Sequence, residues 1–160
     1  MLIYNSPHSV LKRVRVIADF QFGENVGMAL FPDDCSFIFS RTGRVRQVML
    51  DDRHLATVRA ADGRLTIGFE GASRIHEAIA SPAYRVMVRL DVAFIVAEGK
   101  NVFARHVISA DSIIQAGDEV MVVTSDDELL ATGIAVLSGH EMLAFNYGLA
   151  VKVREGKPVS

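Results

Sequence analysis

The sequence predicts an α+β protein in which an antiparallel sheet with flanking helices is followed by a second unit built mostly of strands. Three observations carry this prediction. Apolar residues recur every three or four positions from Ser6 to Phe22, which is the spacing of an amphipathic helix. Segments with alternating apolar residues, separated by turns, then fill residues 35–69. Between residues 84 and 155, one short helical segment lies among five or six strand segments, which is typical of a small closed or partly closed barrel.

The amino-terminal half is expected to begin with a helix over residues 6–22. Ser6 or Ser9 is its expected N-cap, and Gly23 ends it. Four strands then form a meander, at residues 35–40, 44–50, 55–60 and 64–69. A second helix is expected over residues 71–81, with Ser73 as its cap and Pro82 just after its end.

The carboxy-terminal half is expected to begin with a strand over residues 84–90. A short helix over residues 91–98 follows, with Asp91 as N-cap and Gly99 as the C-terminal stop. Residues 139–148 form a loop or a short turn of helix, and the remaining strands are expected at residues 102–111, 115–124, 129–138 and 149–155. Pro82 is the best boundary candidate, so we expect two domains, residues 1–82 and 83–160, with a shared interface.

Composition limits the classes of function. The chain has 160 residues, of which 50% are apolar and 22% charged, as is typical of a globular protein rather than a disordered one. No apolar run approaches the roughly 18 residues that a membrane helix needs. The net charge is −2, so any nucleic-acid surface must be a local basic patch. Cys35 is the only cysteine and cannot form an internal disulfide, so a reducing cytoplasm is the expected location.

The sequence contains no recognisable catalytic motif. Its five histidines are scattered without paired spacing on a helix, which argues against a zinc or iron site. Asp126, Asp127 and Glu128 fall in a hairpin turn, where acidic side chains are usually only solvated. Cys35 is expected to be a small buried apolar residue. We therefore expect no catalytic residue, no metal and no cofactor in this chain.

Four segments of the carboxy-terminal half follow the pattern of a known RNA-binding domain: "VAFIVAEGKNVFARHV", "AGDEVMVV", "LLATGIAVLSGHEM" and "GLAVKVREG". In order and spacing they resemble the PUA domain, a pseudo-barrel that binds RNA. The resemblance implies that residues 83–160 form a PUA-type β pseudo-barrel.

The amino-terminal half extends this resemblance. The segments "ADFQFG", "SRTGRVRQV", "LATVRAADGRLTIGFEGASRI" and "SPAYRVMV" are similar to the domain that precedes PUA in archaeosine tRNA-guanine transglycosylases. The family's catalytic barrel, with its acidic nucleophile and cysteine-rich zinc site, has no counterpart here, and one cysteine cannot build that zinc site. The resemblance therefore implies the detached tRNA-binding subunit of a split transglycosylase, or a relative that serves another tRNA-modifying enzyme.

The resemblance also points to RNA-binding residues around the first helix of the barrel. In PUA domains the glycine after this helix, here Gly99, lets RNA approach the backbone because no Cβ intervenes. Lys100 and Arg105 would then meet phosphates. His106 would hydrogen-bond or stack if its ring faces outward.

The end of the barrel supplies further candidates. Lys152 and Arg154 alternate along the last strand and would point to one face, although a merely solvated face explains them equally well. Tyr147 and Phe145 could stack on exposed bases. We expect Phe145 to pack in the core instead, and the position of Tyr147 stays open.

The densest basic cluster of the sequence flanks the first hairpin turn and consists of Arg41, Arg44 and Arg46. It suits a tRNA arm electrostatically, and a solubilising hairpin is the alternative. A second basic cluster on the first helix is assigned to solvent or to a partner subunit: Lys12, Arg13 and Arg15.

The expected function is to bind tRNA and position it for a separate catalytic subunit that exchanges a guanine base in the archaeosine pathway. The expected partners are thus tRNA and a transglycosylase catalytic chain, without a membrane, and homo-oligomerisation stays open. One alternative is a stand-alone PUA protein that serves another RNA-modification enzyme, ribosome assembly or translation. A small-molecule enzyme is the other, and it would need a polar pocket with a perturbed ionisable group.

Overall fold

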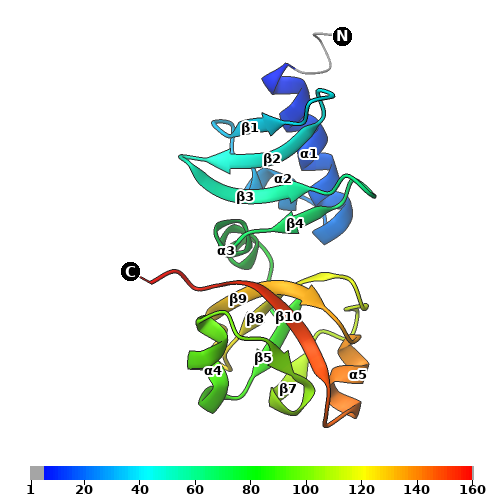
Figure 1. The fold of residues 1–160 in the computed structure, drawn as a ribbon, viewed down its shortest axis with the longest axis vertical. Helices are drawn as coiled ribbons and strands as arrows, with labels where there is room; N and C mark the ends of the chain where they lie inside the picture. The colour runs from blue at the N-terminus through cyan, green and yellow to red at the C-terminus, as the bar shows by residue number, and fades with distance from the viewer. Residues whose placement is uncertain (1–5, 160) are drawn as a thin grey trace. The chain divides into compact units, whose positions relative to one another are not determined.

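The computed structural model describes residues 6–159, and the chain divides after Ala78 into two compact units (Figure 1). The α+β class expected from the sequence is confirmed: a four-stranded antiparallel sheet comes first and a nearly closed six-stranded barrel second. Within the described residues, no helix has both the length and the apolar character needed to span a membrane.

The first unit contains the four-strand meander and two helices in the expected places, together with a short helix that was not expected. Its elements are α1 (Pro7–Phe22), α2 (Val26–Leu30), β1 (Ser36–Phe39), β2 (Val45–Leu50), β3 (Arg53–Val58), β4 (Leu65–Ile67) and α3 (Phe69–Ala78).

Helix α1 begins and ends where its capping residues dictate. Ser6 is the N-cap, because its hydroxyl accepts a hydrogen bond from the Ser9 backbone N–H at 3.2 Å. Gly23 closes the helix by donating its N–H to the Asp19 carbonyl. The buried stripe that includes Val10 and Val14 faces the core of the unit, and this burial supplies most of the stability of such a helix.

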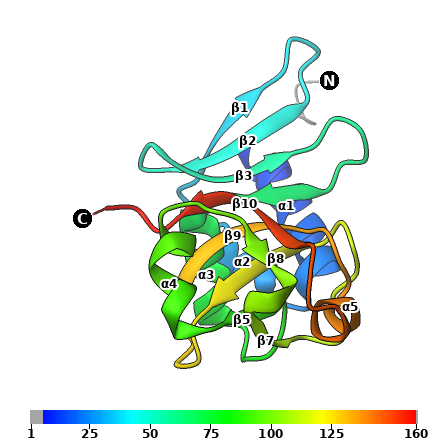
Figure 2. The ribbon, with the colours of Figure 1, turned by 60° about the horizontal axis from the view of Figure 1, so that its bottom comes forward.

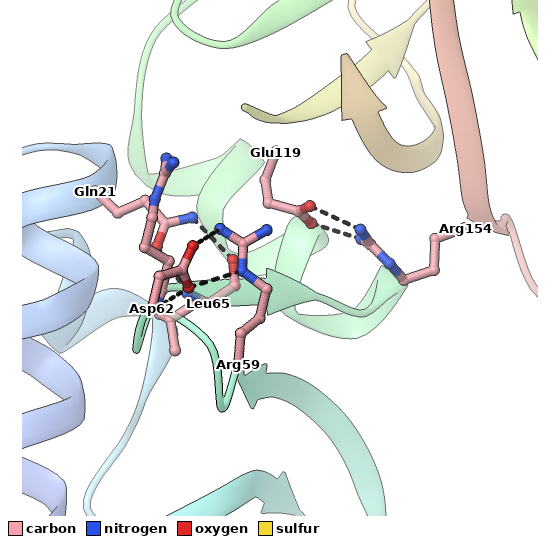
Figure 3. A network of polar contacts seen from close by, with 7 residues as sticks. Gln21, Arg59, Asp62, Leu65, Glu119 and Arg154 are labelled. Atoms are coloured by element: carbon pink, nitrogen blue, oxygen red, sulfur yellow. Dashed lines mark hydrogen bonds and ion pairs between the residues drawn. The ribbon is translucent and has the colours of Figure 1, made fainter. Parts of the chain in front are cut away.

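The sheet has the strand order β1-β2-β3-β4, and α1 and α2 lie behind it in Figure 1. Val48, Ala56 and Ile67 pair across three neighbouring strands and are buried, so they form the core face of the sheet. The side-chain amide of Gln21 ties α1 to β4, since it both donates to and accepts from the Leu65 backbone at 2.9 and 2.8 Å (Figure 3).

Two features of the first unit differ from the sequence prediction. Helix α3 begins at Phe69, where the Ala72 N–H already donates to the Gly68 carbonyl, so Ser73 lies inside the helix and does not cap it. Helix α2 was not expected, because five residues are too few to show a helical period.

The second unit contains six strands and two α-helices, and its elements are β5 (Arg85–Val88), α4 (Leu90–Ala97), β6 (Val102–Phe103), β7 (Val107–Ala110), β8 (Glu119–Val123), β9 (Leu129–Ala135), α5 (Gly139–Ala144) and β10 (Leu149–Gly156). The strand order is β6-β10-β9-β8-β5-β7, with only β5 and β8 parallel among these pairs. Figure 2 shows β10 beside β9, with α4 and α5 on opposite sides of the barrel.

One ion pair joins β8 and β10, two strands of the barrel that are separated by β9. Glu119 on β8 accepts two hydrogen bonds, at 2.5 and 2.7 Å, from the guanidinium of Arg154 on β10 (Figure 3). The Glu119 side chain is 2% exposed. A buried carboxylate without a partner is strongly unfavourable, so this pair fixes β10 relative to β8.

The same pair coincides with a bulge in β10. Val153 pairs with Gly133 and Glu155 pairs with Thr132, which leaves Arg154 as the extra residue. A Cβ at Gly133 would lie 2.3 Å from the Lys152 carbonyl oxygen, so only glycine lets β9 approach the bulged strand this closely. The bulge interrupts the regular alternation of side chains along β10, from which Lys152 and Arg154 were expected to point to one face.

The start of α4 corrects a second capping prediction. Arg89, not Asp91, is the N-cap residue, and Asp91 lies in the first turn of the helix. The Asp91 carboxylate is engaged by the Arg89 guanidinium at 2.9 and 3.0 Å, which lowers the pKa of Asp91. The side chain that was expected to cap backbone N–H groups is thus bound to a neighbouring cation.

We expect Arg154→Ala to lower the free energy of unfolding by roughly 3 kcal/mol, because it removes the guanidinium that donates two hydrogen bonds to the buried Glu119 carboxylate. The additional substitution Glu119→Gln should restore part of the loss, because a neutral amide costs less to bury than a charge. Urea denaturation of the three proteins measures both effects. Equal stability of Arg154→Ala and the wild type would contradict this role.

Candidate nucleic-acid interface

The end of helix α4 is closed by a glycine-dependent cap. Gly99 has φ = +106°, a left-handed conformation that glycine adopts without strain. Its N–H donates to the Val96 carbonyl, and the Lys100 N–H donates to the Ile95 carbonyl, which is the pattern of a Schellman motif. No heavy atom lies within 4 Å of a Cβ built on Gly99, so the backbone here is open. The cap leaves the Lys100 side chain exposed at the start of the next segment.

Strand pairing places this segment beside β10. Val102 pairs with Val151, and Phe103 pairs with Leu149. The Ala104 N–H then donates to the Gly148 carbonyl at 2.8 Å. As a result, the loop before β10 lies next to the residues that follow β6. We call the exposed side chains along this pairing the β6–β10 edge, and they are Lys100, Phe103, Arg105, Tyr147 and Lys152.

Arg105 and His106 have different environments although they are adjacent. The Arg105 guanidinium lies 5.3 Å from the centre of the exposed Phe103 ring, a cation–π arrangement. His106 is only 9% exposed and meets the Phe103 ring edge-on at 5.9 Å between centroids. The condition for direct RNA contact by His106, an outward-facing ring, is therefore not met. Its buried Nδ1 has no hydrogen-bond partner among the described residues.

The two aromatic residues before β10 are both at the surface. Tyr147 is 72% exposed and Phe145 is 38% exposed, so the expectation that Phe145 packs in the core is wrong. Their rings stack nearly parallel, with centroids 6.0 Å apart. The loop that contains them is held by backbone hydrogen bonds at its two ends, and it presents a flat aromatic surface to solvent.

Ion pairing distinguishes two sets among the basic residues of the described chain, residues 6–159, and Arg13, Arg64 and Arg74 are assigned to neither. In the first set each cation has a carboxylate partner: Arg15 with Asp33, Arg53 with Glu70, Arg59 with Asp62, Arg85 with Asp127, Arg89 with Asp91, Arg154 with Glu119 and Lys157 with Glu128. The second set has no carboxylate partner there and comprises Lys12, Arg41, Arg44, Arg46, Lys100, Arg105 and Lys152.

The pairing revises the interpretation of two acidic residues and one basic residue. Asp127 does not simply face solvent, because it binds the buried Arg85 at 2.7 and 3.2 Å and so ties the β8–β9 turn to β5. Glu119 was not singled out from the sequence, although an acid within the apolar run of β8 signals a partner. Arg154 is that partner and serves the fold.

The basic cluster of the first unit lies at the β1–β2 turn. Arg41 and Arg44 are exposed and Arg46 is half-buried. Ile38 pairs with Gln47 whereas Phe39 pairs with Val45, so Arg46 is the extra residue of a bulge in β2. The Ser40 hydroxyl accepts from the Arg44 N–H at 3.2 Å and bonds the Thr42 hydroxyl at 3.0 Å, which orders the turn.

No group of three or more His, Cys, Asp or Glu residues suited to a metal ion occurs in the described part of the chain. Cys35 is half-buried, and burial, which is the largest cause, raises the pKa of its thiol to about 11. Because the thiolate is the reactive form, this cysteine is a poor nucleophile at neutral pH.

Two family models together account for nearly the whole chain. The patch-forming domain C2 of tRNA-guanine transglycosylase matches residues 12–82, and the PUA domain matches residues 84–157. This chain is a PUA-domain protein. The resemblance to the carboxy-terminal part of archaeosine tRNA-guanine transglycosylase, first seen in short sequence motifs, is confirmed.

Curated relatives of this PUA-domain protein are named tRNA-guanine(15) transglycosylase. The relative from Methanothermobacter thermautotrophicus is 47% identical over 91% of this chain and 22% of its own length. The relative from Thermococcus kodakarensis is 49% identical over 91% of this chain and 25% of its own length. The chain thus spans about a quarter of the length of the curated relatives it matches.

The fold of this PUA-domain protein also occurs in a solved structure. A hypothetical protein from Pyrococcus horikoshii superposes with a TM-score of 0.72, covering 94% of this chain and 91% of that one. The two sequences are 22% identical, so the likeness concerns the fold alone.

We expect the buried His106 to make the protein less stable in mild acid. Burial lowers its pKa below 6.5, and Arg105 and Arg89 lower it further, while Asp91 opposes them. As pH falls below 6.5 the unfolded chain takes up this proton first, so folded-state stability falls. The free energy of unfolding in urea at pH 7.5 and 5.5 should therefore decrease more in the wild type than in His106→Gln. An equal decrease in both proteins would contradict this.

Proposed function

We propose that this PUA-domain protein binds tRNA and positions it for guanine-base exchange by a separate catalytic subunit. The observation that supports this most is the division of the cations. Carboxylates neutralise basic residues that hold strands and turns together, whereas Lys100, Arg105 and Lys152 along the β6–β10 edge have no such partner among residues 6–159. Unpaired cations attract RNA phosphates, because binding releases the counterions that surround the nucleic acid.

Four residues of the β6–β10 edge and the adjacent Gly99 have roles in RNA binding in this proposal. Lys100, Arg105 and Lys152 contact phosphates and so supply affinity without base specificity. Gly99 keeps the backbone after α4 open to the RNA. The Tyr147 ring is exposed enough for an unpaired base to stack on it. Folded tRNA offers both partners, since it combines duplex backbone with a single-stranded end.

Two further residues support the edge from within the barrel. The buried His106 ring packs against Phe103, on which the Arg105 guanidinium lies. Arg154 holds β10 through Glu119 and thereby places Lys152. We assign both residues to positioning the contacts rather than to touching RNA.

The two parts of the chain divide the work in this proposal. Residues 83–160 form the RNA-binding PUA domain, and residues 1–82 form a preceding domain that adds Arg41, Arg44 and Arg46. The curated relatives are named for guanine exchange in tRNA, which supports tRNA as the ligand. We assign base exchange to a separate transglycosylase catalytic subunit. This subunit would correspond to the part of the curated relatives that this chain does not match.

We expect the purified protein to bind labelled tRNA at 50 mM salt and to lose affinity steeply as salt is raised to 200 mM. Replacing Lys100 and Lys152 by Ala should lower the affinity by about tenfold or more and reduce the salt slope by about two, roughly one per lost phosphate contact. Lys157→Ala is the matched control, since Lys157 is paired with Glu128. Absence of wild-type binding at low salt would contradict the proposed function.

A further inference from the structure

A groove of about 810 Å³ opens within the first unit, between helix α1 and two hairpin turns. Arg13, Val14 and Ile17 of α1 line it on one side. The rest is lined by Ser40 and residues 42–46 around the β1–β2 turn, and by residues 58–63 around the β3–β4 turn. Its volume lies in the range of specific ligand sites. The residues that line this groove all belong to the first unit, whereas those of the β6–β10 edge belong to the second.

The groove has more cationic than anionic side chains. Its walls contain Arg13, Arg44, Arg46 and Arg59 but only one carboxylate, that of Asp62. Asp62 binds the Arg59 guanidinium through both oxygens, at 3.1 and 2.8 Å (Figure 3). This carboxylate therefore neutralises Arg59, while Arg44 and Arg46 have no carboxylate partner in the described chain.

Both turns that carry these charges are fixed by local hydrogen bonds. In the first, the Ser40 N–H donates to the Arg44 carbonyl at 2.7 Å, beside the Ser40–Thr42 hydroxyl contact. In the second, the Arg64 N–H donates to the Asp62 carboxylate at 3.0 Å, and this hydrogen bond is the main cause of the lowered pKa of Asp62. The cations are thus presented from ordered backbone, which reduces the entropy lost when a ligand binds.

Apolar side chains lie between these charges. Val14 is fully buried and Val58 nearly so, and both line the groove. Electrostatic attraction is stronger beside such low-polarity walls than on a flat wet surface.

We propose that this groove binds phosphate groups of the RNA backbone, with Arg44 and Arg46 as the main contacts and Arg13 beside them. The inference rests on the tRNA binding proposed above and adds a second contact region, in the domain that precedes the barrel. Asp62 limits the positive charge of the groove by holding Arg59. Guanidinium groups suit this task because their paired N–H donors match phosphate oxygens.

The test compares tRNA binding by full chains across a salt series. The double variant Arg44→Ala/Arg46→Ala should lose about tenfold or more in affinity and about two units of salt slope. Arg53→Ala is the matched control, because Arg53 lies in the same unit, outside the groove, and is paired with Glu70. Asp62→Asn keeps an oxygen for the Arg64 N–H but frees Arg59, so it should bind tRNA more tightly with a steeper slope. Thermal melting confirms that each variant is folded.

The outcomes separate this inference from the proposed function. If the wild type binds tRNA and the double variant behaves like Arg53→Ala, the groove is not a phosphate site although tRNA binding stands. If Asp62→Asn binds no more tightly than the wild type, the role of Asp62 as a counter-charge is overturned. If the wild type itself does not bind, the proposed function fails first.

Discussion

The ion pair between Arg154 and Glu119 is the interaction on which the barrel and its basic edge both depend. It reaches from β10 to β8 past the intervening β9, and it occurs at the bulge that makes Arg154 the extra residue of its strand. A carboxylate buried as deeply as Glu119 requires such a partner. The pair therefore fixes the course of β10, and with it the position of Lys152 and of the residues that β10 pairs with on β6.

Some cations of the chain form ion pairs that stabilise the fold, and others have no carboxylate partner among the described residues. This difference explains how a chain of net charge −2 can present basic surfaces. Carboxylates form ion pairs with arginines that stabilise turns and strands. Asp127 pairs with Arg85, and Asp62 pairs with Arg59. Among the cations without carboxylate partners in the described residues, Lys100, Arg105 and Lys152 lie along the β6–β10 edge, and Arg44 and Arg46 line the groove of the first unit. Because physiological salt screens exposed charges beyond about 8 Å, the local potential of these surfaces, and not the net charge of the chain, governs contact with a polyanion.

Much of the fold could be predicted because it depends on local pattern. The helical period of α1, its Ser6 cap and the meander of β1 to β4 follow from spacing and turn residues, and the structure has them. Helix α2 was not predicted because it is shorter than two turns and shows no helical period. Asp91 failed as a cap because its carboxylate had a better partner two residues earlier, the Arg89 guanidinium.

Less of the candidate site could be predicted, because it depends on neighbours that are distant in sequence. The pattern placed Lys152 and Arg154 together, but only the fold shows that Arg154 is held by Glu119. Burial of His106 and exposure of Phe145 are likewise set by packing around β6 and β10. The groove combines α1 with two turns, so no single segment of sequence could reveal it. Arg13, assigned to solvent or a partner from its helix alone, lines it.

The most direct test of the central claim is chemical footprinting of lysines with and without tRNA. Acetylation of Lys100, Lys152 and Lys157, quantified by mass spectrometry at low salt, compares two unpaired lysines with one that is paired to Glu128. The account predicts that tRNA protects Lys100 and Lys152 and leaves Lys157 as reactive as before. Protection of Lys157 alone, or no protection of Lys100 and Lys152 by bound tRNA, would contradict it.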